Sequence, residues 1–322
     1  MDAALANLLS PPVLCFLLGL LAGIVRSDLE IPEAVARALA LYLIFSIGFK
    51  GGVELAANGD LRPLLAPLLV AAGLSLFLPL PAFGLLRLLA RVSRVDAGAI
   101  AAHYGSVSIV TYVAATSFLS SRGIVFEGFL AAVVAVMETP AILTGLLLAR
   151  AGETAGLDAR RRRELVHEIL ANGSVVLLLG SFAIGMLTGS DGMRRLEPVV
   201  ASGFQGLLCF FLIDMGLLVA RRFAGFATMG GGLLLFGVLM PLLGASAGLA
   251  AGWLLGLSVG GTALFATLAA SASYIAVPAA MRLALPRANP SLSLSLALGI
   301  TFPFNLVVGI PLYVAAAGRL VG

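Results

Sequence analysis

Hydroxyl-bearing side chains gather at two places in a chain that is otherwise strongly apolar. The segment GSVSIVTY carries Ser106, Ser108 and Thr111, and the segment SASY carries Ser271 and Ser273. Hydroxyl groups and free backbone N–H groups are neutral donors that can bind an anion without any arginine. We therefore treat these five residues as candidate anion ligands. The alternative is that small residues allow helices to pack closely, as they often do in membranes.

Oxygen-bearing side chains of a second kind lie in two proline-containing segments, METPAIL and ITFPFNL. They are Glu138 and Thr139 in the first segment and Thr301 and Asn305 in the second. A carboxylate, hydroxyls, an amide and carbonyls freed by proline together suit a small hard cation such as sodium. The alternative for Glu138 is a structural hydrogen bond to the neighbouring backbone.

Four other ionisable side chains lie within apolar runs, where a charge costs about 2.5–3.5 kcal/mol on insertion scales. Lys50 and Glu54 are four residues apart on one predicted helix, a spacing that favours mutual neutralisation, with a role as coupling charges as the alternative. Asp214 has no partner nearby in the sequence and is either a coupling carboxylate or a helix-packing residue. His103 is interpreted as a hydrogen-bonded core histidine, with a proton relay as the alternative.

The composition places these residues in a membrane. Of the 322 residues, 60% are hydrophobic and 11% are charged, whereas a soluble domain is about 45–50% apolar and about 25% charged. The net charge of +4 comes almost entirely from arginine, without the basic, aromatic-rich face that binds nucleic acid. Cys15 and Cys209 lie in apolar runs, so neither a disulfide framework nor a zinc site is expected.

Ten apolar stretches are long enough to cross the hydrocarbon, which takes about 20 helical residues. The first stretch lacks a basic start and a cleavage site, so it is predicted to be a retained helix. The predicted spans cover residues 6–25, 34–56, 64–90, 97–119, 126–149, 172–189, 202–220, 229–256, 261–284 and 290–317.

The loops between these spans alternate in arginine content. With the segment 151–171 in the cytoplasm, thirteen arginines lie on the inner side and five on the outer side or at the C-terminal end. This excess predicts that both termini lie outside. The outer pair Arg194 and Arg195 runs against the rule.

The two halves of the chain resemble each other. A shift of 165 residues aligns GSVSIVTYVAA with ASASYIAVPAA, a shift of 163 aligns METPAIL with ITFPFNL, and a shift of 168 aligns LYLIFSIG with CFFLIDMG. Five spans per half is an odd number, so the second half would be inverted in the membrane. We predict an all-α membrane protein with two inverted five-helix repeats, residues 1–150 and 172–322, joined by a basic cytoplasmic loop, residues 151–171.

Inverted repeats of this kind bring interrupted helices together near the middle of the membrane. Spans four and nine are the candidates, because both have small residues around a Ser-x-Ser and Pro278 disfavours a continuous ninth span. Each half-helix N-terminus carries roughly half a positive charge, so two of them facing each other would attract an anion.

Four long segments of the sequence resemble a known family. They are IPEAVARALALYLIFSIGFKGGVEL, GSVSIVTYVAA, METPAIL and ASASYIAVPAAMRLALPRANPSLSLSLALGITFPFNLVVGIPLY. In this order, over nearly the whole chain, they are similar to the sodium-dependent bicarbonate transporter family of cyanobacteria and other bacteria. The resemblance implies a homotrimer in the bacterial plasma membrane, with a gate domain (spans 1, 2, 6 and 7) and a mobile core domain (spans 3–5 and 8–10) in each protomer. It also implies that bicarbonate and sodium bind where the broken spans four and nine cross.

Carried over residue by residue, the resemblance assigns the hydroxyls of spans four and nine to the anion site and makes Glu138 the acidic position of span five. Two features depart from the family. The cyanobacterial proteins carry an aspartate where this chain has Tyr274. The central loop, about 150–171, is shorter here, so binding of their PII-like regulatory partner is not expected.

The function expected from these features is secondary active transport, namely sodium-coupled uptake of bicarbonate or a similar small anion by an elevator-like motion. Sodium is the expected coupling ion, and no cofactor is expected. The alternatives are transport of another organic anion, cation/proton exchange through Glu138 and Asp214, and a membrane sensor or scaffold that binds without transporting. An enzyme is not expected, because the sequence has two histidines and no serine elbow, HExxH or paired-aspartate motif.

Overall fold

The computed structural model describes residues 9–58, 62–138, 140–150, 173–221, 229–274 and 276–322. Within these ranges every regular element is a helix, and seven helical runs are long and apolar enough to cross a membrane. One of the seven, Val176–Arg221, covers two of the predicted spans. Two shorter apolar helices, Pro11–Ile24 and Val259–Ala270, correspond to the first and ninth predicted spans. The chain is a multi-pass, all-helical membrane protein.

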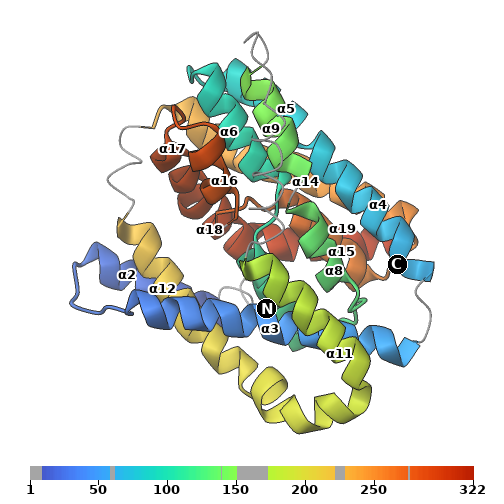
Figure 1. Ribbon diagram of the computed structural model, residues 1–322. Coiled ribbons are helices and arrows are strands. Elements are labelled where there is room, and N and C mark those ends of the chain that lie inside the picture. Colours follow the sequence, from blue (N-terminus) through green and yellow to red (C-terminus); the bar gives the residue numbers. More distant parts are fainter. Residues whose placement is uncertain (1–8, 59–61, 139, 151–172, 222–228, 275) are drawn as a thin grey trace.

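Four long helices form one group on one side of the molecule (Figure 1). α3 packs along α11, and α2 packs along α12. The bounds of these helices, and of the π-helix that joins the last two, are α2 (Pro11–Ile24), α3 (Glu33–Asn58), α11 (Gly173–Glu197), η1 (Pro198–Ser202) and α12 (Phe204–Arg221).

The helix pairs of this group touch at glycines. A Cβ added at Gly52 of α3 would lie 1.9 Å from the carbonyl oxygen of Phe182 on α11. A Cβ added at Gly19 of α2 would lie 2.0 Å from the carbonyl oxygen of Ile213 on α12. The backbones are therefore in direct contact, which is how membrane helices pack when burial of apolar surface gives no driving force.

The remaining helices form a second group, in which residues 97–117 of the run Arg94–Ser121 are all buried. α14 packs against α15, and α6 packs against α9 and α5. The bounds are α4 (Arg62–Phe77), α5 (Pro79–Leu89), α6 (Arg94–Gly105), α7 (Ile109–Ser121), α8 (Leu130–Met137), α9 (Pro140–Arg150), α14 (Gly231–Leu254), α15 (Val259–Ala270), α16 (Ala276–Ala284), α17 (Pro290–Leu296), η2 (Ala297–Thr301), α18 (Phe302–Phe304), η3 (Asn305–Gly309) and α19 (Ile310–Val321).

The predicted spans four and nine are both interrupted. α6 ends at Gly105, and Ser106 then takes an extended conformation with φ −90° and ψ 173° before α7 begins. α15 ends at Ala270, and Ser271 takes a nearly identical conformation with φ −82° and ψ 165°. The Ser-x-Ser segments predicted to break these helices are the places where the helices break.

The half-helices that lead into the interruptions begin with the same kind of cap. Ser93 precedes α6 and its Oγ accepts the N–H of Asp96, while Ser258 precedes α15 and its Oγ accepts the N–H of Gly261. Serine caps of this kind satisfy a free N–H of the first turn. Ser93 and Ser258 are 165 residues apart, which is the offset that also relates the two Ser-x-Ser segments.

Each of these caps is also bound by a segment from the opposite half of the chain. Oδ1 of Asp96 accepts the N–H of Asn289, the residue before α17, at 2.8 Å. Oε1 of Glu127, which lies shortly before α8, accepts the N–H of Ser258 at 2.7 Å. The start of α6 is thus tied to the start of the last span, and the start of α15 to the start of the fifth.

Three further predicted spans contain breaks; the sequence analysis anticipated the carbonyls freed at Pro140 and Pro303 but not the division of the third span. The third span is divided into α4 and α5 just before Pro79, and the fifth begins at Leu130 rather than residue 126 and is divided just before Pro140. The tenth passes through two π-helices around Pro303. A proline lacks the N–H that continues a helix, and π-turns commonly absorb such a change in register. The predicted cytoplasmic loop 151–171 lies outside the described residues.

Candidate functional site

The two helix interruptions lie against each other and are joined by hydrogen bonds. The N–H of Ser108 donates to Oγ of Ser271 at 2.9 Å, and the N–H of Ser273 donates to the carbonyl of His103 at 2.8 Å. Nδ1 of His103 lies 2.6 Å from the carbonyl oxygen of Ser273. Because a carbonyl only accepts, Nδ1 carries the proton and donates. His103 is therefore a hydrogen-bonded core residue, as predicted, and we call this junction the crossing.

Three of the predicted anion ligands use their hydroxyls to hold the crossing together. Oγ of Ser271 accepts from Ser108 and donates within its own half-helix at 2.8 Å. Oγ of Ser108 accepts the N–H of Thr111 at 3.2 Å and so caps α7. Oγ of Ser106 donates to the backbone carbonyl of Glu138 at 3.2 Å. These hydroxyls shape the site and tie it to α8.

Other donors at the crossing are not used in this way. Thr111 and Ser273 are buried residues whose hydroxyls make no hydrogen bond within the part of the chain that the structure describes, although neither oxygen is among the fully enclosed side-chain atoms that lack a partner. In the same part of the chain, the N–H groups of Ile109 and Val110 in the first turn of α7 have no acceptor. Buried polar groups without protein partners bind water or a ligand. Together they form a neutral donor set at the positive end of α7.

Glu138 lies at the break between α8 and α9, and its side chain is buried. The residue is 2% exposed, and its Oε2 atom makes no hydrogen bond with the described residues. The structural alternative, a carboxylate fully bonded to nearby backbone, therefore does not account for this oxygen. A buried carboxylate without a partner is expensive unless it binds a cation or a proton.

A hydroxyl from another helix opens the break beside Glu138. The N–H of Ala141 donates to Oγ of Ser75 at 3.1 Å, and that Oγ donates to the carbonyl of Met137 at 2.8 Å. Ser75 of α4 thus replaces a direct helical hydrogen bond with a bridged one. Pro140 has no N–H, so the carbonyl of Val136 has also lost its usual helical donor.

Two of the other predicted cation ligands are engaged in structural hydrogen bonds. Oγ1 of Thr301 donates to a carbonyl of α14 at 2.8 Å and lies 2.6 Å from Oη of Tyr104, which therefore donates to it. Nδ2 of Asn305 donates to the carbonyl of Ala270 at 2.9 Å, and Oδ1 of Asn305 accepts from Oη of Tyr313 at 2.8 Å. Each of these oxygens accepts one hydrogen bond and keeps one further lone pair.

The remaining predicted cation ligand, Thr139, lies outside the described residues. Among the described residues, no group of three or more histidine, cysteine, aspartate or glutamate side chains comes together in a way that would hold a metal ion. A cation here would rely on hydroxyl, amide and carbonyl oxygens around a single carboxylate.

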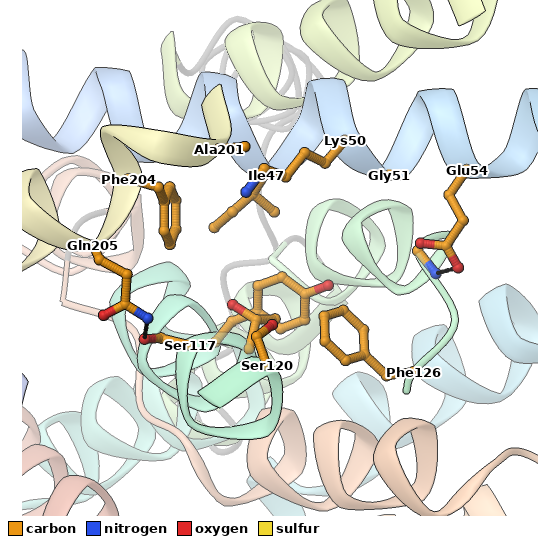
Figure 2. Close-up of a pocket in the computed structure, with 13 residues that line it drawn as sticks. Ile47, Lys50, Gly51, Glu54, Ser117, Ser120, Phe126, Ala201, Phe204 and Gln205 are labelled. Atoms are coloured by element: carbon orange, nitrogen blue, oxygen red, sulfur yellow. Dashed lines mark hydrogen bonds between the residues drawn. The ribbon is translucent and has the colours of Figure 1, made fainter. Parts of the chain in front are cut away.

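The predicted neutralisation of Lys50 by Glu54 is wrong. Figure 2 shows the two side chains pointing away from each other, and they form no ion pair in the described ranges. Nζ of Lys50 lies 4.6 Å from the centre of the Phe204 ring, and Oε1 of Glu54 accepts the N–H of Gly128 at 2.8 Å. The four-residue rule describes an isolated helix, whereas here each side chain has a partner on another element.

Asp214 and Tyr274 are the two remaining positions singled out by sequence. Asp214 is half-buried on α12, and the charge that acts on it is Arg221. Tyr274, at the position where cyanobacterial relatives carry aspartate, packs edge-to-face on Phe302 with ring centres 6.2 Å apart. Its hydroxyl lies 4.0 Å from the sulfur of Met215 on α12. Tyr274 therefore links the crossing to the first group of helices.

Comparison with known proteins places this geometry in a family. The sequence model described as the Na+-dependent bicarbonate transporter superfamily matches residues 11–318. The chain belongs to this superfamily. Nearly the whole chain is covered, so the resemblance seen in the sequence is confirmed. No curated protein matches the chain. Membership in a transporter superfamily, together with the multi-pass helical fold, makes the protein a membrane transporter rather than an enzyme.

The sequence analysis missed three residues that support the candidate ligands through hydrogen bonds. Ser75, Tyr104 and Tyr313 all bond to the segments around Glu138, Thr301 and Asn305. Each is a polar residue within an otherwise apolar helix, which is a usable signal because such residues are rarely without a buried partner.

Proposed function

We propose that this protein takes up bicarbonate, or a similar small anion, together with sodium. The observation that carries the proposal is the buried crossing of two interrupted helices in a chain of the Na+-dependent bicarbonate transporter superfamily. Coupling is needed because an anion entering a cell at −100 mV climbs about 2.3 kcal/mol. One sodium ion per anion cancels this electrical cost and adds the sodium gradient.

In this proposal the anion binds at the start of α7. The N–H groups of Ile109 and Val110 and the hydroxyls of Thr111 and Ser273 have no partner among the described residues and serve as donors. Ser106, Ser108 and Ser271 keep the two helix ends in place around it. A site of neutral donors at a helix end holds a single negative charge without trapping it in an ion pair.

Sodium binds, in the same proposal, at the break in the fifth span. Glu138 supplies the carboxylate and Val136 a carbonyl freed by proline. Thr139 is proposed as a further ligand from sequence alone. Thr301 and Asn305 would contribute the lone pair that each side-chain oxygen has left. All are oxygen ligands, as a hard cation prefers.

We further propose the architecture that the sequence predicted. It has ten spans in two inverted repeats, 1–150 and 172–322, with a gate domain (α2, α3, α11 and α12), a core domain of the other helices and a homotrimeric assembly. The shared offset of 165 residues between the caps of α6 and α15 supports the repeats. The two groups of helices in Figure 1 support the division into domains, and the hydrogen-bonded crossing suits a core that moves as one body past the gate. Outward-facing termini, a bacterial plasma membrane and the lack of a PII-like partner remain predictions.

Reconstituted vesicles test the proposal directly. Uptake of isotopically labelled bicarbonate is measured with and without sodium for the wild type and for the double variant Thr111→Val/Ser273→Ala. Thr267→Val is the matched control, because Thr267 is equally buried but its hydroxyl bonds within its own helix at 2.8 Å. We expect sodium-dependent uptake that falls at least about tenfold in the double variant, the effect of losing roughly 1.4 kcal/mol of binding, and is retained in the control.

Two results would contradict the proposal. Full-rate uptake without sodium would remove the coupling, and equal uptake by the double variant and the control would remove Thr111 and Ser273 from the site. The unpaired oxygen of Glu138 also suits a second function, cation/proton exchange through Glu138 and Asp214. Exchange would change the internal pH of the vesicles when sodium is added without bicarbonate.

A further inference from the structure

A cavity of about 250 Å³ lies between α3 and α12 on one side and α7 on the other (Figure 2). None of the serines of the crossing lines it. At about 30 Å³ for each water molecule, the cavity has room for about eight waters, or for a small ion with part of its hydration shell. Its size therefore suits a small ligand.

The cavity contains the only lysine of the chain. Lys50 lies on α3 in the middle of an apolar run, and its side chain lines the cavity. Its ammonium group has no ion pair within the described ranges. Glu54 also lines the cavity but is turned towards Gly128, and Glu197, which accepts the hydroxyl of Ser202 at 2.7 Å, acts on Lys50 only from beyond ion-pair distance. A cation at this depth needs a counter-charge.

The contact of Lys50 with Phe204 does not replace such a counter-charge. The ring face attracts the ammonium group from 4.6 Å, but it accepts no ordinary hydrogen bond, and an ammonium has three N–H donors. Figure 2 shows Phe204 and Gln205 on the wall that faces Ser117 and Ser120. Lys50 is therefore a partly buried positive charge beside polar side chains, in a cavity whose lining also includes the carboxylate of Glu54.

A row of hydroxyls connects this cavity to the crossing. Ser108, Tyr112, Thr116 and Ser120 are spaced four residues apart on α7 and its cap, so they lie along one face of the helix. The last three line the cavity, and Ser108 is the cap at the crossing. Twelve residues at 1.5 Å each span about 18 Å.

We propose that this cavity is a second anion site, in which Lys50 pairs with a small planar oxyanion, a bicarbonate or a short carboxylate, before the anion reaches the crossing. Only the identity of the anion rests on the proposed function. The charge on Lys50, the size of the cavity and the hydroxyl row are independent of it. Lys50 thus acts on the capture of the anion and not on its release at the other side.

The electrostatic character of the cavity can be measured without any transport. In a Cys15→Ala/Cys209→Ala background, Ser120→Cys places one thiol at the exposed mouth of the cavity. The thiol is modified by an anionic and by a cationic methanethiosulfonate of similar size, and the two rates are measured in three proteins, which carry lysine, arginine (Lys50→Arg) or methionine (Lys50→Met) at position 50. Ser121→Cys is the matched control, because Ser121 is exposed beside it but does not line the cavity.

We expect the anionic reagent to be favoured when residue 50 is positive, and the anionic-to-cationic rate ratio to fall about tenfold in Lys50→Met. The ratio at Ser121→Cys should change much less. With Lys50 intact, modification of Ser120→Cys should also be slower in bicarbonate or formate than in gluconate of the same ionic strength. This measurement does not depend on whether a Lys50 variant folds. An unchanged ratio, or modification that neither small anion slows, would overturn the proposal.

Uptake then separates this proposal from the proposed function. If the wild type transports bicarbonate, Lys50→Met should raise KM about tenfold with kcat within twofold of the wild type, and Lys50→Arg should restore KM. A lower kcat with unchanged KM would contradict a role in capture. If the wild type does not transport bicarbonate, the proposed function fails, while the modification rates still decide whether the cavity binds small anions.

Discussion

Replacing Ser271 by alanine tests how much the crossing contributes to stability. The Oγ atom of Ser271 makes two hydrogen bonds, accepting from the N–H of Ser108 at 2.9 Å and donating to the carbonyl of Leu268 at 2.8 Å. That carbonyl keeps a second donor, the N–H of Ser271 itself at 3.1 Å. The N–H of Ser108 keeps none within the described residues. The variant therefore leaves one buried donor unpaired, which costs about 1–3 kcal/mol.

The matched control is Ser246→Ala on α14. Ser246 is exposed and its hydroxyl bonds to the carbonyl four residues earlier at 2.9 Å, so its loss should change the free energy of unfolding by less than about 0.5 kcal/mol. Ser106→Ala should fall between the two, because its bond to the Glu138 carbonyl is longer at 3.2 Å. The free energies can be measured by dodecyl sulfate titration in mixed micelles, followed by circular dichroism. If Ser271→Ala is as stable as Ser246→Ala, the crossing is not held together as described.

Three further predictions follow from single positions. Sodium should stabilise the wild type against thermal unfolding, and the gain should grow with the logarithm of the sodium concentration. At one hundred times the dissociation constant the gain in free energy of unfolding is about 2.7 kcal/mol. This gain should be absent in Glu138→Gln. In a differential thermal unfolding assay, Gly52→Ala should be strongly destabilised or fail to assemble, because its Cβ would lie 1.9 Å from a carbonyl oxygen. Its control, Gly84→Ala, has open space around the Cβ and should be as stable as the wild type or more stable by up to about 1 kcal/mol. Tyr274→Phe should retain at least half of the wild-type uptake in vesicles, because the ring stays packed on Phe302 and the hydroxyl, which lies beside the Ser108 side chain and 4.0 Å from the sulfur of Met215, is not among the proposed ligands. A complete loss of uptake would assign that hydroxyl to the site.

The positions of the helix breaks were predictable because they depend on local chemistry. Glycine, proline and Ser-x-Ser patterns weaken a helix wherever they occur, and the breaks at Ser106 and Ser271 lie in such patterns. The carbonyls freed at Pro140 were anticipated in the same way. The division at Pro79 was equally local but was missed, because hydropathy averaged over a span hides a single proline. Hydropathy reports where a chain can cross a membrane and not whether it crosses as one helix.

The partners of polar side chains were much less predictable. Lys50 and Glu54 matched a helical pairing rule, but each bonds to an element that is far away in the sequence. The insertion of Ser75 into the ladder of the fifth span depends on the approach of two helices, which no single-chain pattern records. The sequence therefore identified residues that need partners, such as Glu138 and His103, more reliably than it identified the partners.

The bonds that join the two interruptions also affect how the protein is made. Ser108 and Ser271 are separated by 163 residues along the chain, and His103 and Ser273 by 170. At roughly 5–20 residues per second, a ribosome needs on the order of 10–30 seconds to supply the missing partner. During that interval the break in the nascent fourth span carries polar groups without their partners, such as the N–H of Ser108 and the ring of His103, that lipid cannot satisfy. Biogenesis must shelter this half, in the translocon or against a chaperone, until its counterpart has been synthesised.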